Sequence, residues 1–149
     1  MIRWITMKDW AGDDDDENES SEADFERRRE EYWRHLESIS DRLPADLIAA
    51  DRRLHDAELL AIEYDVDTKR LRLRVKPLES PQERWTFTQV SQYNWINHRM
   101  QAGRGPVWDM GYSELRLVPT GFQMDILFTS GLELCLEAGG FVLSEGTVP

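Results

Sequence analysis

Residues 70–76 read Arg-Leu-Arg-Leu-Arg-Val-Lys, an unbroken alternation of basic and apolar side chains. Successive side chains of a β-strand point to opposite faces, so this period of two predicts a strand whose buried face carries Leu71, Leu73 and Val75. Its other face is basic and meets water. Residues 60–64 alternate in the same way, and a short turn-forming segment separates the two runs. Together they predict an antiparallel hairpin.

Short alternating runs separated by good turn formers continue to the C-terminus. The turns are Pro-Thr-Gly at 119–121 and Thr-Ser-Gly at 129–131. The runs lie at Trp85 to Phe87, Tyr112 to Val118, Phe122 to Phe128, Leu132 to Leu136 and Phe141 to Leu143. The pattern predicts an antiparallel meander sheet of about six or seven strands.

The N-terminal third has a helical period instead. Phe25, Tyr32, Leu36 and Ile39 recur at spacings that place them on one side of a helix over residues 24–40. A proline at 44 ends this helix and can open a short second one through residues 47–50. We therefore expect an α+β fold, in which the amphipathic helix covers one face of the sheet.

Length and composition predict one domain, residues 1–149, in the cytoplasm. A chain of 149 residues is the size of one ordinary domain, and its formal charge of -11 disfavours binding to phosphate backbones, so we expect no nucleic-acid partner. The lone Cys135 excludes an intramolecular disulfide, which fits a reducing compartment. The N-terminus does not read as a signal peptide and no apolar stretch is long enough to span a bilayer, so no membrane partner is expected either.

Much of the acidity is concentrated in Gly12 to Glu22. This segment carries seven carboxylates and no apolar side chain, so it cannot recover its ordering entropy by burial and is predicted to be a mobile loop. Asp13 to Asp16 resemble a calcium loop only in charge, because the central glycine and the closing glutamate are missing.

Motifs that would carry chemistry are weak. His55 precedes Asp56, but adjacent residues of an extended segment point to opposite sides, so we interpret this pair as turn-forming rather than catalytic. The histidines at 35, 55 and 98 lack zinc-site spacing. Glutamates flank Cys135 on one face of a predicted strand, which disfavours a nucleophilic thiolate. We expect no catalytic residue, metal or cofactor.

The stretch from Tyr93 to Tyr112 is rich in aromatic side chains and methionine without a clear period. Large rigid aromatics and adaptable methionines suit a partner-binding surface, and Trp95 and Trp108 are the candidate anchors. The alternative is that these side chains cap an open end of the core. The sequence leaves both open.

Four short motifs also carry a resemblance. Residues 32–36 read Tyr-Trp-x-x-Leu, residues 43–47 Leu-Pro-x-x-Leu, residues 54–57 Leu-His-Asp-Ala, and residues 125–134 Asp-Ile-Leu-Phe-Thr-Ser-Gly-Leu-Glu-Leu. In this order the chain resembles small bacterial proteins of a domain-of-unknown-function family, from Phe25 to Leu143. Such proteins are found as immunity proteins beside polymorphic toxins. The resemblance implies that role and supplies no catalytic residues.

The leading hypothesis is therefore a non-enzymatic immunity protein, an antitoxin that binds a basic cognate toxin and occludes its active site or substrate path. The acidic surface would steer the encounter and the aromatic side chains would anchor it. The candidate partner-binding residues are Asp13, Asp14, Asp15, Asp16, Glu17, Glu19, Tyr93, Trp95, Trp108 and Met110.

Two alternatives remain open. One is a small cytosolic hydrolase or lyase that uses His55 or His98 with carboxylates such as Asp56, Asp109 or Glu114. The other is a regulatory adaptor without catalysis.

Overall fold

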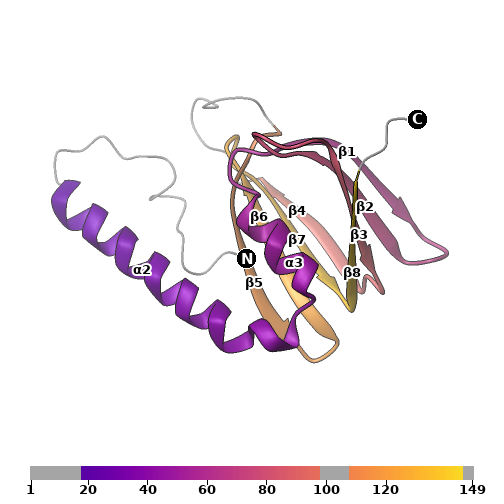
Figure 1. The fold of residues 1–149 in the computed structure, drawn as a ribbon, viewed down its shortest axis with the longest axis horizontal. Coiled ribbons are helices and arrows are strands. Elements are labelled where there is room, and N and C mark those ends of the chain that lie inside the picture. The colour runs from indigo at the N-terminus through magenta and orange to yellow at the C-terminus, as the bar shows by residue number, and fades with distance from the viewer. Residues whose placement is uncertain (1–17, 98–107, 146–149) are drawn as a thin grey trace.

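The structure is a computed structural model that describes residues 18–97 and 108–145, with side chains from Ala23 onward. Within these residues the chain forms two α-helices followed by eight strands (Figure 1), so the expected α+β class is confirmed. The elements are α2 (Asn18–Ile39), a 3-10 turn (Ser40–Arg42), α3 (Ala45–Arg52), β1 (Glu58–Asp65), β2 (Arg70–Lys76), β3 (Glu83–Thr88), β4 (Gln92–Asn97), β5 (Met110–Val118), β6 (Gly121–Phe128), β7 (Leu132–Ala138) and β8 (Gly140–Glu145).

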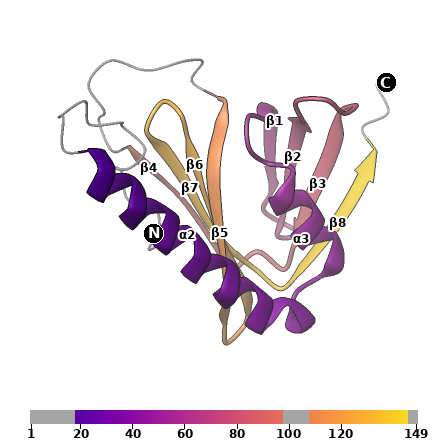
Figure 2. The same cartoon turned by 60° about the vertical axis from the view of Figure 1, so that its left-hand side comes forward.

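The strands form two antiparallel sheets of four strands each, in the orders β1-β2-β3-β8 and β4-β7-β6-β5. The predicted single meander of six or seven strands is wrong in both strand number and arrangement. The strand that the sequence pattern missed is β4, whose side chains are almost all exposed and so lack the alternating burial of a half-buried strand. The two sheets open away from each other like a V in Figure 2.

Two segments of the chain pass from one sheet to the other. β3 leads into β4 and β7 leads into β8, and both segments bend at the same place. Main-chain hydrogen bonds carry the pairing through this corner, from Gly139 N–H to Thr88 O at 3.0 Å and from Ser91 N–H to Glu137 O at 3.0 Å. Gln89 turns the chain there with a left-handed φ of 51°. A Cβ on Gly139 would lie 2.3 Å from Gln89 Oε1, so any other residue there would force the Gln89 side chain to move.

The core lies between the inner faces of the two sheets. The alternation of residues 70–76 is confirmed, since Leu71, Leu73 and Val75 are fully buried. Aromatic side chains from both sheets meet there, since the ring centroids of Phe87 in β3 and Phe122 in β6 are 6.3 Å apart. The largest fully buried side chains include Trp85, Phe87, Phe122, Phe128, Met110 and Met124.

A second corner forms where β1 meets the start of β5. Met110 N–H donates to Ala57 O at 2.7 Å, and Asp56 N–H donates to Met110 O at 2.9 Å. Leu59 N–H donates to Trp108 O at 3.0 Å. Strands β1 and β5 belong to different sheets, so these bonds join the sheets at a point far in sequence from the first corner.

Helix α3 fills the space between β8 and β5, the outer strands of the two sheets on this side (Figure 2). Its apolar side is fully buried at Leu47 and Ala50. Asp51, one turn after Leu47 on the same buried side, accepts a hydrogen bond from Ser113 of β5. The predicted short helix is therefore confirmed, and it closes a gap that no strand pairing closes.

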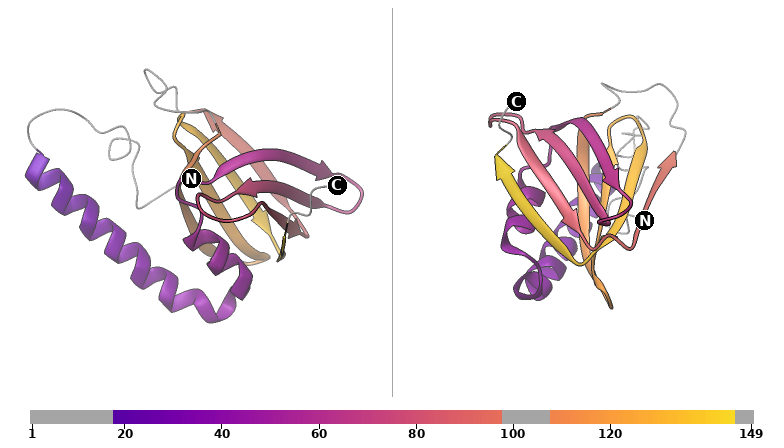
Figure 3. Two further views of the ribbon diagram at one scale, coloured as in Figure 1. Left: turned by 45° about the horizontal axis from the view of Figure 1, so that its top comes forward. Right: turned by 90° about the vertical axis from the view of Figure 1, so that its right-hand side faces the viewer.

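Helix α2 lies along β5 and protects the unpaired edge of that strand (Figures 1 and 3). Leu115 N–H donates to the Tyr32 hydroxyl at 2.9 Å, and His35 Nε2 donates to Leu115 O at 3.2 Å. Two side chains of the helix thus replace a neighbouring strand. The predicted helical stripe is confirmed, since Tyr32, Leu36 and Ile39 are buried.

The helix begins at Asn18, earlier than predicted. Residues 18–22 of the expected acidic loop are therefore helical, and residues 12–17 lie outside the described part of the chain. Neither helix in that part is long and apolar enough to cross a membrane.

Replacing Tyr32 by Phe tests how α2 protects the β5 edge. The variant removes the acceptor for the buried Leu115 N–H, so the free energy of unfolding should fall by about 1–3 kcal/mol. Urea denaturation measures this loss, and amide hydrogen exchange should accelerate at Leu115. Tyr93→Phe, a change at an exposed ring, should cost less than about 0.5 kcal/mol. Equal losses in the two variants would contradict the edge-protecting role.

Candidate functional site

Two tryptophans pack edge to face on the surface above a buried phenylalanine. The ring centroids of Trp95 and Trp108 are 5.9 Å apart with an interplanar angle of 74°. Phe128 lies 5.8 Å from Trp95 and 6.0 Å from Trp108. Phe128 is fully buried, while Trp95 and Trp108 remain 38% and 44% exposed. The core therefore supports a large aromatic surface that water still reaches.

A pair of tyrosines accompanies these tryptophans. Tyr93 lies two residues before Trp95 in β4 and so faces the same side, and its ring centroid is 4.8 Å from that of Tyr64 in β1. Tyr93 is 36% exposed, and Ile62 of β1, two residues before Tyr64, is 38% exposed. We call Tyr64, Tyr93, Trp95 and Trp108 the aromatic cluster.

The aromatic cluster answers the question that the sequence left open for residues 93–112. Tyr93, Trp95 and Trp108 are partly exposed, whereas Met110 has no exposed surface and belongs to the core. The prediction that Met110 contacts a partner is therefore wrong, because a side chain without exposed surface cannot touch a partner. Among the described residues of this segment both alternatives therefore occur: Met110 belongs to the core, and the rings of Tyr93, Trp95 and Trp108 reach solvent.

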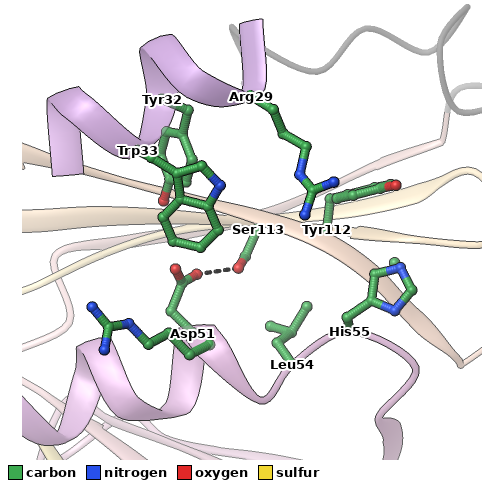
Figure 4. A pocket seen from close by; sticks show the side chains of 10 residues that line it. Arg29, Tyr32, Trp33, Asp51, Leu54, His55, Tyr112 and Ser113 are labelled. Atoms are coloured by element: carbon green, nitrogen blue, oxygen red, sulfur yellow. Dashed lines mark hydrogen bonds between the residues drawn. The ribbon is translucent and has the colours of Figure 1, made fainter. Parts of the chain in front are cut away.

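A separate pocket of about 160 Å³ opens between α2, α3 and β5 (Figure 4). We call it the Asp51 pocket. Its lining residues are Arg29, Tyr32 and Trp33 of α2, Asp51 and Arg52 of α3, Leu54 and His55 just beyond α3, and Gly111, Tyr112 and Ser113 of β5. Sequence analysis did not single out Asp51 or Ser113, because the contact between them spans 62 positions of the chain.

Asp51 is a carboxylic acid held in an environment that disfavours its charge. Burial raises the pKa of Asp51 to about 7, against a hydrogen bond from Ser113 and the positive charge of Arg52, and the charge of Glu114 raises the pKa further. Only 8% of Asp51 is exposed. Burial also raises the pKa of the neighbouring Tyr32, whose phenol therefore stays neutral. A buried acid that titrates near neutrality in a pocket is a feature of many functional sites.

His55 lies at the edge of the same pocket and pairs with its neighbour. His55 Nδ1 and Asp56 Oδ2 are 3.0 Å apart, so the expectation that Asp56 would not orient the ring is wrong. The reason is that Asp56 is not extended but has a φ of 64°. Both side chains are more than half exposed. The Tyr112 ring also packs against His55, with centroids 5.4 Å apart.

Asp109 and Glu114, the other described groups of the hydrolase hypothesis, do not line this pocket. Glu114 follows Ser113 in β5 and therefore points to the opposite side of the strand. Asp109 forms a bridge with Glu58 at the corner between the sheets. His98 lies outside the described residues, as do Asp13, Asp14, Asp15, Asp16 and Glu17, and the side chain of Glu19 is not described.

The second sheet also contains a network of buried charges. Arg116 of β5 forms an ion pair with Asp125 of β6, and the Cys135 thiol donates to Glu133 Oε2 at 2.9 Å. Burial and the hydrogen bond to Glu133 raise the pKa of Cys135, so the predicted disfavouring of the thiolate holds.

Asp125, Glu133 and Cys135 could offer three metal-ligand atoms within 4.8 Å of one another. The Arg116 guanidinium, however, already supplies positive charge to the Asp125 carboxylate, and Cys135 keeps its proton. A metal ion would have to displace both interactions. We therefore interpret the group as a structural network.

Comparison with known proteins adds no family assignment. No protein-family model matches the chain, and no curated protein is significantly similar to it in sequence. Any function must therefore be argued from the aromatic cluster, the Asp51 pocket and the charge of the chain.

The titration of Asp51 predicts an unusual dependence of stability on pH. Its pKa is raised to about 7 in the folded chain, so between about pH 4 and 7 the folded state holds a proton that the unfolded chain releases. This group therefore stabilises the fold at low pH, and that contribution is lost as the pH rises, by at most about 1.4 kcal/mol per pH unit.

Asp51→Asn removes this contribution and keeps a carbonyl acceptor for Ser113. The wild type should lose stability relative to Asp51→Asn between pH 4 and 7, by a few kcal/mol in total. Urea denaturation of both proteins at a series of pH values measures the difference. Parallel curves would show that Asp51 is not buried as described.

Proposed function

We propose that this chain is an immunity protein, an antitoxin that binds a cognate bacterial toxin in the cytoplasm and covers its active site or substrate path. The aromatic cluster is the observation that carries the proposal. Such a surface can bury a large apolar area against a partner. Tryptophan and tyrosine are the residues that most often dominate binding energy at protein interfaces. The motif resemblance of residues 25–143 points to the same role.

The architecture around the cluster suits a protein partner. Trp95 and Trp108 rest on the buried ring of Phe128, so their positions are set before binding and little side-chain entropy remains to be lost. In the described part of the chain, β4 pairs with β7 only and forms the edge of its sheet. A strand of the toxin could add to this edge while the rings anchor its side chains.

The charge of the chain favours a basic partner. The formal net charge is -11, and seven of the acidic residues lie within Gly12 to Glu22. Opposite net charges raise the rate of encounter between two proteins, and the effect weakens as salt is added. A toxin that acts on phosphate-bearing substrates would have a basic active site, which an acidic antitoxin can cover.

Cell survival tests the proposed function directly. The toxin candidate is the product of the gene adjacent to that of this chain. Cells that express this product should stop growing, and co-expression of the present chain should restore growth and yield a stable complex of the two purified proteins. A non-toxic neighbour, or a toxic one that this chain neither binds nor restrains, would overturn the proposal.

Alanine substitution of either tryptophan should weaken the complex. Trp95→Ala and Trp108→Ala each remove an interface anchor, and a loss of about 2 kcal/mol corresponds to a roughly thirtyfold higher Kd. Titration calorimetry measures the change, and thermal unfolding confirms that each variant is folded. Leu78→Ala serves as a control, because Leu78 is 66% exposed but lies outside the cluster. Equal binding by all four proteins would remove the cluster from the interface.

The acidic segment should act on the association rate. Replacing Asp13, Asp14, Asp15 and Asp16 by asparagine should slow association and reduce its salt dependence, with little change in dissociation. Stopped-flow mixing at several salt concentrations measures both. The variant Asp67→Asn with Glu79→Gln removes exposed charge elsewhere and should have a smaller effect. An unchanged association rate in the first variant would deny the segment a steering role.

A further inference from the structure

We propose that the Asp51 pocket is a binding site for a small aromatic acid, a single ring with a hydroxyl or amino group at one end and a carboxylate at the other. The site is separate from the aromatic cluster and does not depend on the antitoxin role. Four features of the pocket define this ligand: its volume, its walls, its base and its rim (Figure 4).

The volume fits one ring. The pocket encloses about 160 Å³, and apolar protein cavities of about 150 Å³ are known to bind benzene. Typical sites for larger ligands such as dinucleotides or drug-sized molecules are about 300–1,000 Å³. A single ring therefore fills the part of the pocket near Asp51.

The walls are largely apolar and aromatic. Trp33 of α2 and Tyr112 of β5 line the pocket together with Leu54, which is almost fully buried. Trp33 itself is 40% exposed, although it belongs to a helix whose other apolar side chains are packed inward. A bound ring would cover part of this indole and gain the stacking energy of aromatic pairs.

The base of the pocket is polar and suits a ligand that carries a hydrogen-bond donor. Ser113 donates to Oδ1 of Asp51, which leaves acceptor capacity on the carboxylate, because an ionised carboxylate can accept about four hydrogen bonds. Tyr32 lines the same space, but its hydroxyl is occupied by the Leu115 N–H. The hydroxyl or amino group of the ligand would donate to Asp51 in a site with little water.

The rim of the pocket is basic and favours a ligand with a negatively charged group. Arg29 and Arg52 both line the pocket, and Arg29 reaches over Tyr112 toward its centre in Figure 4. The ion pair of Arg29 with Glu26 is long, at 3.8 Å, and exposed, so it offers little competition. A guanidinium binds a carboxylate through two parallel hydrogen bonds. The same rim disfavours a cationic ligand, which Asp51 alone would have attracted.

The pH should modulate binding through Asp51. The pocket around the carboxylate is lined by Arg29 and Tyr32 of α2, by Arg52 and His55 at the end of α3, and by Ser113 of β5. Arg52 and Glu114 act on Asp51 through their charges. Burial raises the pKa of Asp51 to about 7, and only the ionised form offers all its acceptor sites to the ligand's donor. The contribution of Asp51 to affinity should therefore grow as the pH rises from 6 to 8, and Asp51→Asn should abolish that dependence.

Three related probes test the proposal on the full chain. 4-Hydroxybenzoate carries the ring, the donor and the anion, benzoate lacks the donor, and phenol lacks the anion. Titration followed by NMR should give a Kd for 4-hydroxybenzoate at least about tenfold lower than for either of the others. Shifts should concentrate at Trp33 and Ser113. Absence of binding at about 10 mM, or equal binding of all three probes, would overturn the proposal.

Substitutions locate the site. Arg29→Gln and Trp33→Leu should each raise the Kd for 4-hydroxybenzoate by about tenfold or more, since each removes one of the required contacts. Arg34→Gln is the matched control, because Arg34 is an exposed arginine of the same helix that does not line the pocket. Thermal unfolding verifies that the variants fold. A loss of binding in the control as large as in Arg29→Gln would assign the effect to net charge and refute the site.

Discussion

The bend that β3–β4 and β7–β8 share at Gln89 and Gly139 makes two sheets out of one continuous ribbon. Once this corner exists, the inner faces of the sheets converge, and the fully buried side chains of both fill the space between them. Gly139 leaves room at this corner for the Gln89 side chain, whose Oε1 would lie 2.3 Å from a Cβ at that position. The same arrangement of the sheets leaves the space between β8 and β5 that α3 fills, and it brings the start of β5 beside β1.

The edges that the bend creates are protected by different means. The β5 edge is covered by α2, whose Tyr32 and His35 bond both main-chain groups of Leu115. The β4 edge carries exposed aromatic rings instead and is left without a second strand in the described residues. Unprotected edges with apolar side chains promote association. Because α2 covers the β5 edge, the β4 edge is the one edge of this sheet that a partner strand can reach in the described part of the chain.

Charge is distributed in the same uneven way. The acidic excess lies mostly in one segment, while the outer face of β2 is basic and the second sheet buries an arginine among three acidic groups. Asp51 differs from all of these, because its carboxylate lines a pocket and accepts a hydrogen bond from the Ser113 hydroxyl. Burial outweighs the hydrogen bond from Ser113 and the positive charge of Arg52, and so raises the pKa of Asp51 to about 7. The aromatic cluster and the Asp51 pocket thus offer two chemically distinct surfaces on one domain.

Local patterns in the sequence predicted both helices and seven of the eight described strands, but the buried face of only some of them. In β1 the alternation of residues 60–64 was misleading, since Leu59 is buried and Ile62 is 38% exposed. The period of two in residues 70–76, the helical stripe through Tyr32 and Leu36, and the proline at 44 depend only on neighbours along the chain, and the structure confirms them. The tertiary structure alone decided how the strands divide between two sheets and that residues 92–97 form β4. It also decided the burial of Met110 and the hydrogen bond between Asp51 and Ser113. A period tells which side of a strand is apolar but not which strand lies beside it, since that pairing is set by contacts between residues far apart in sequence.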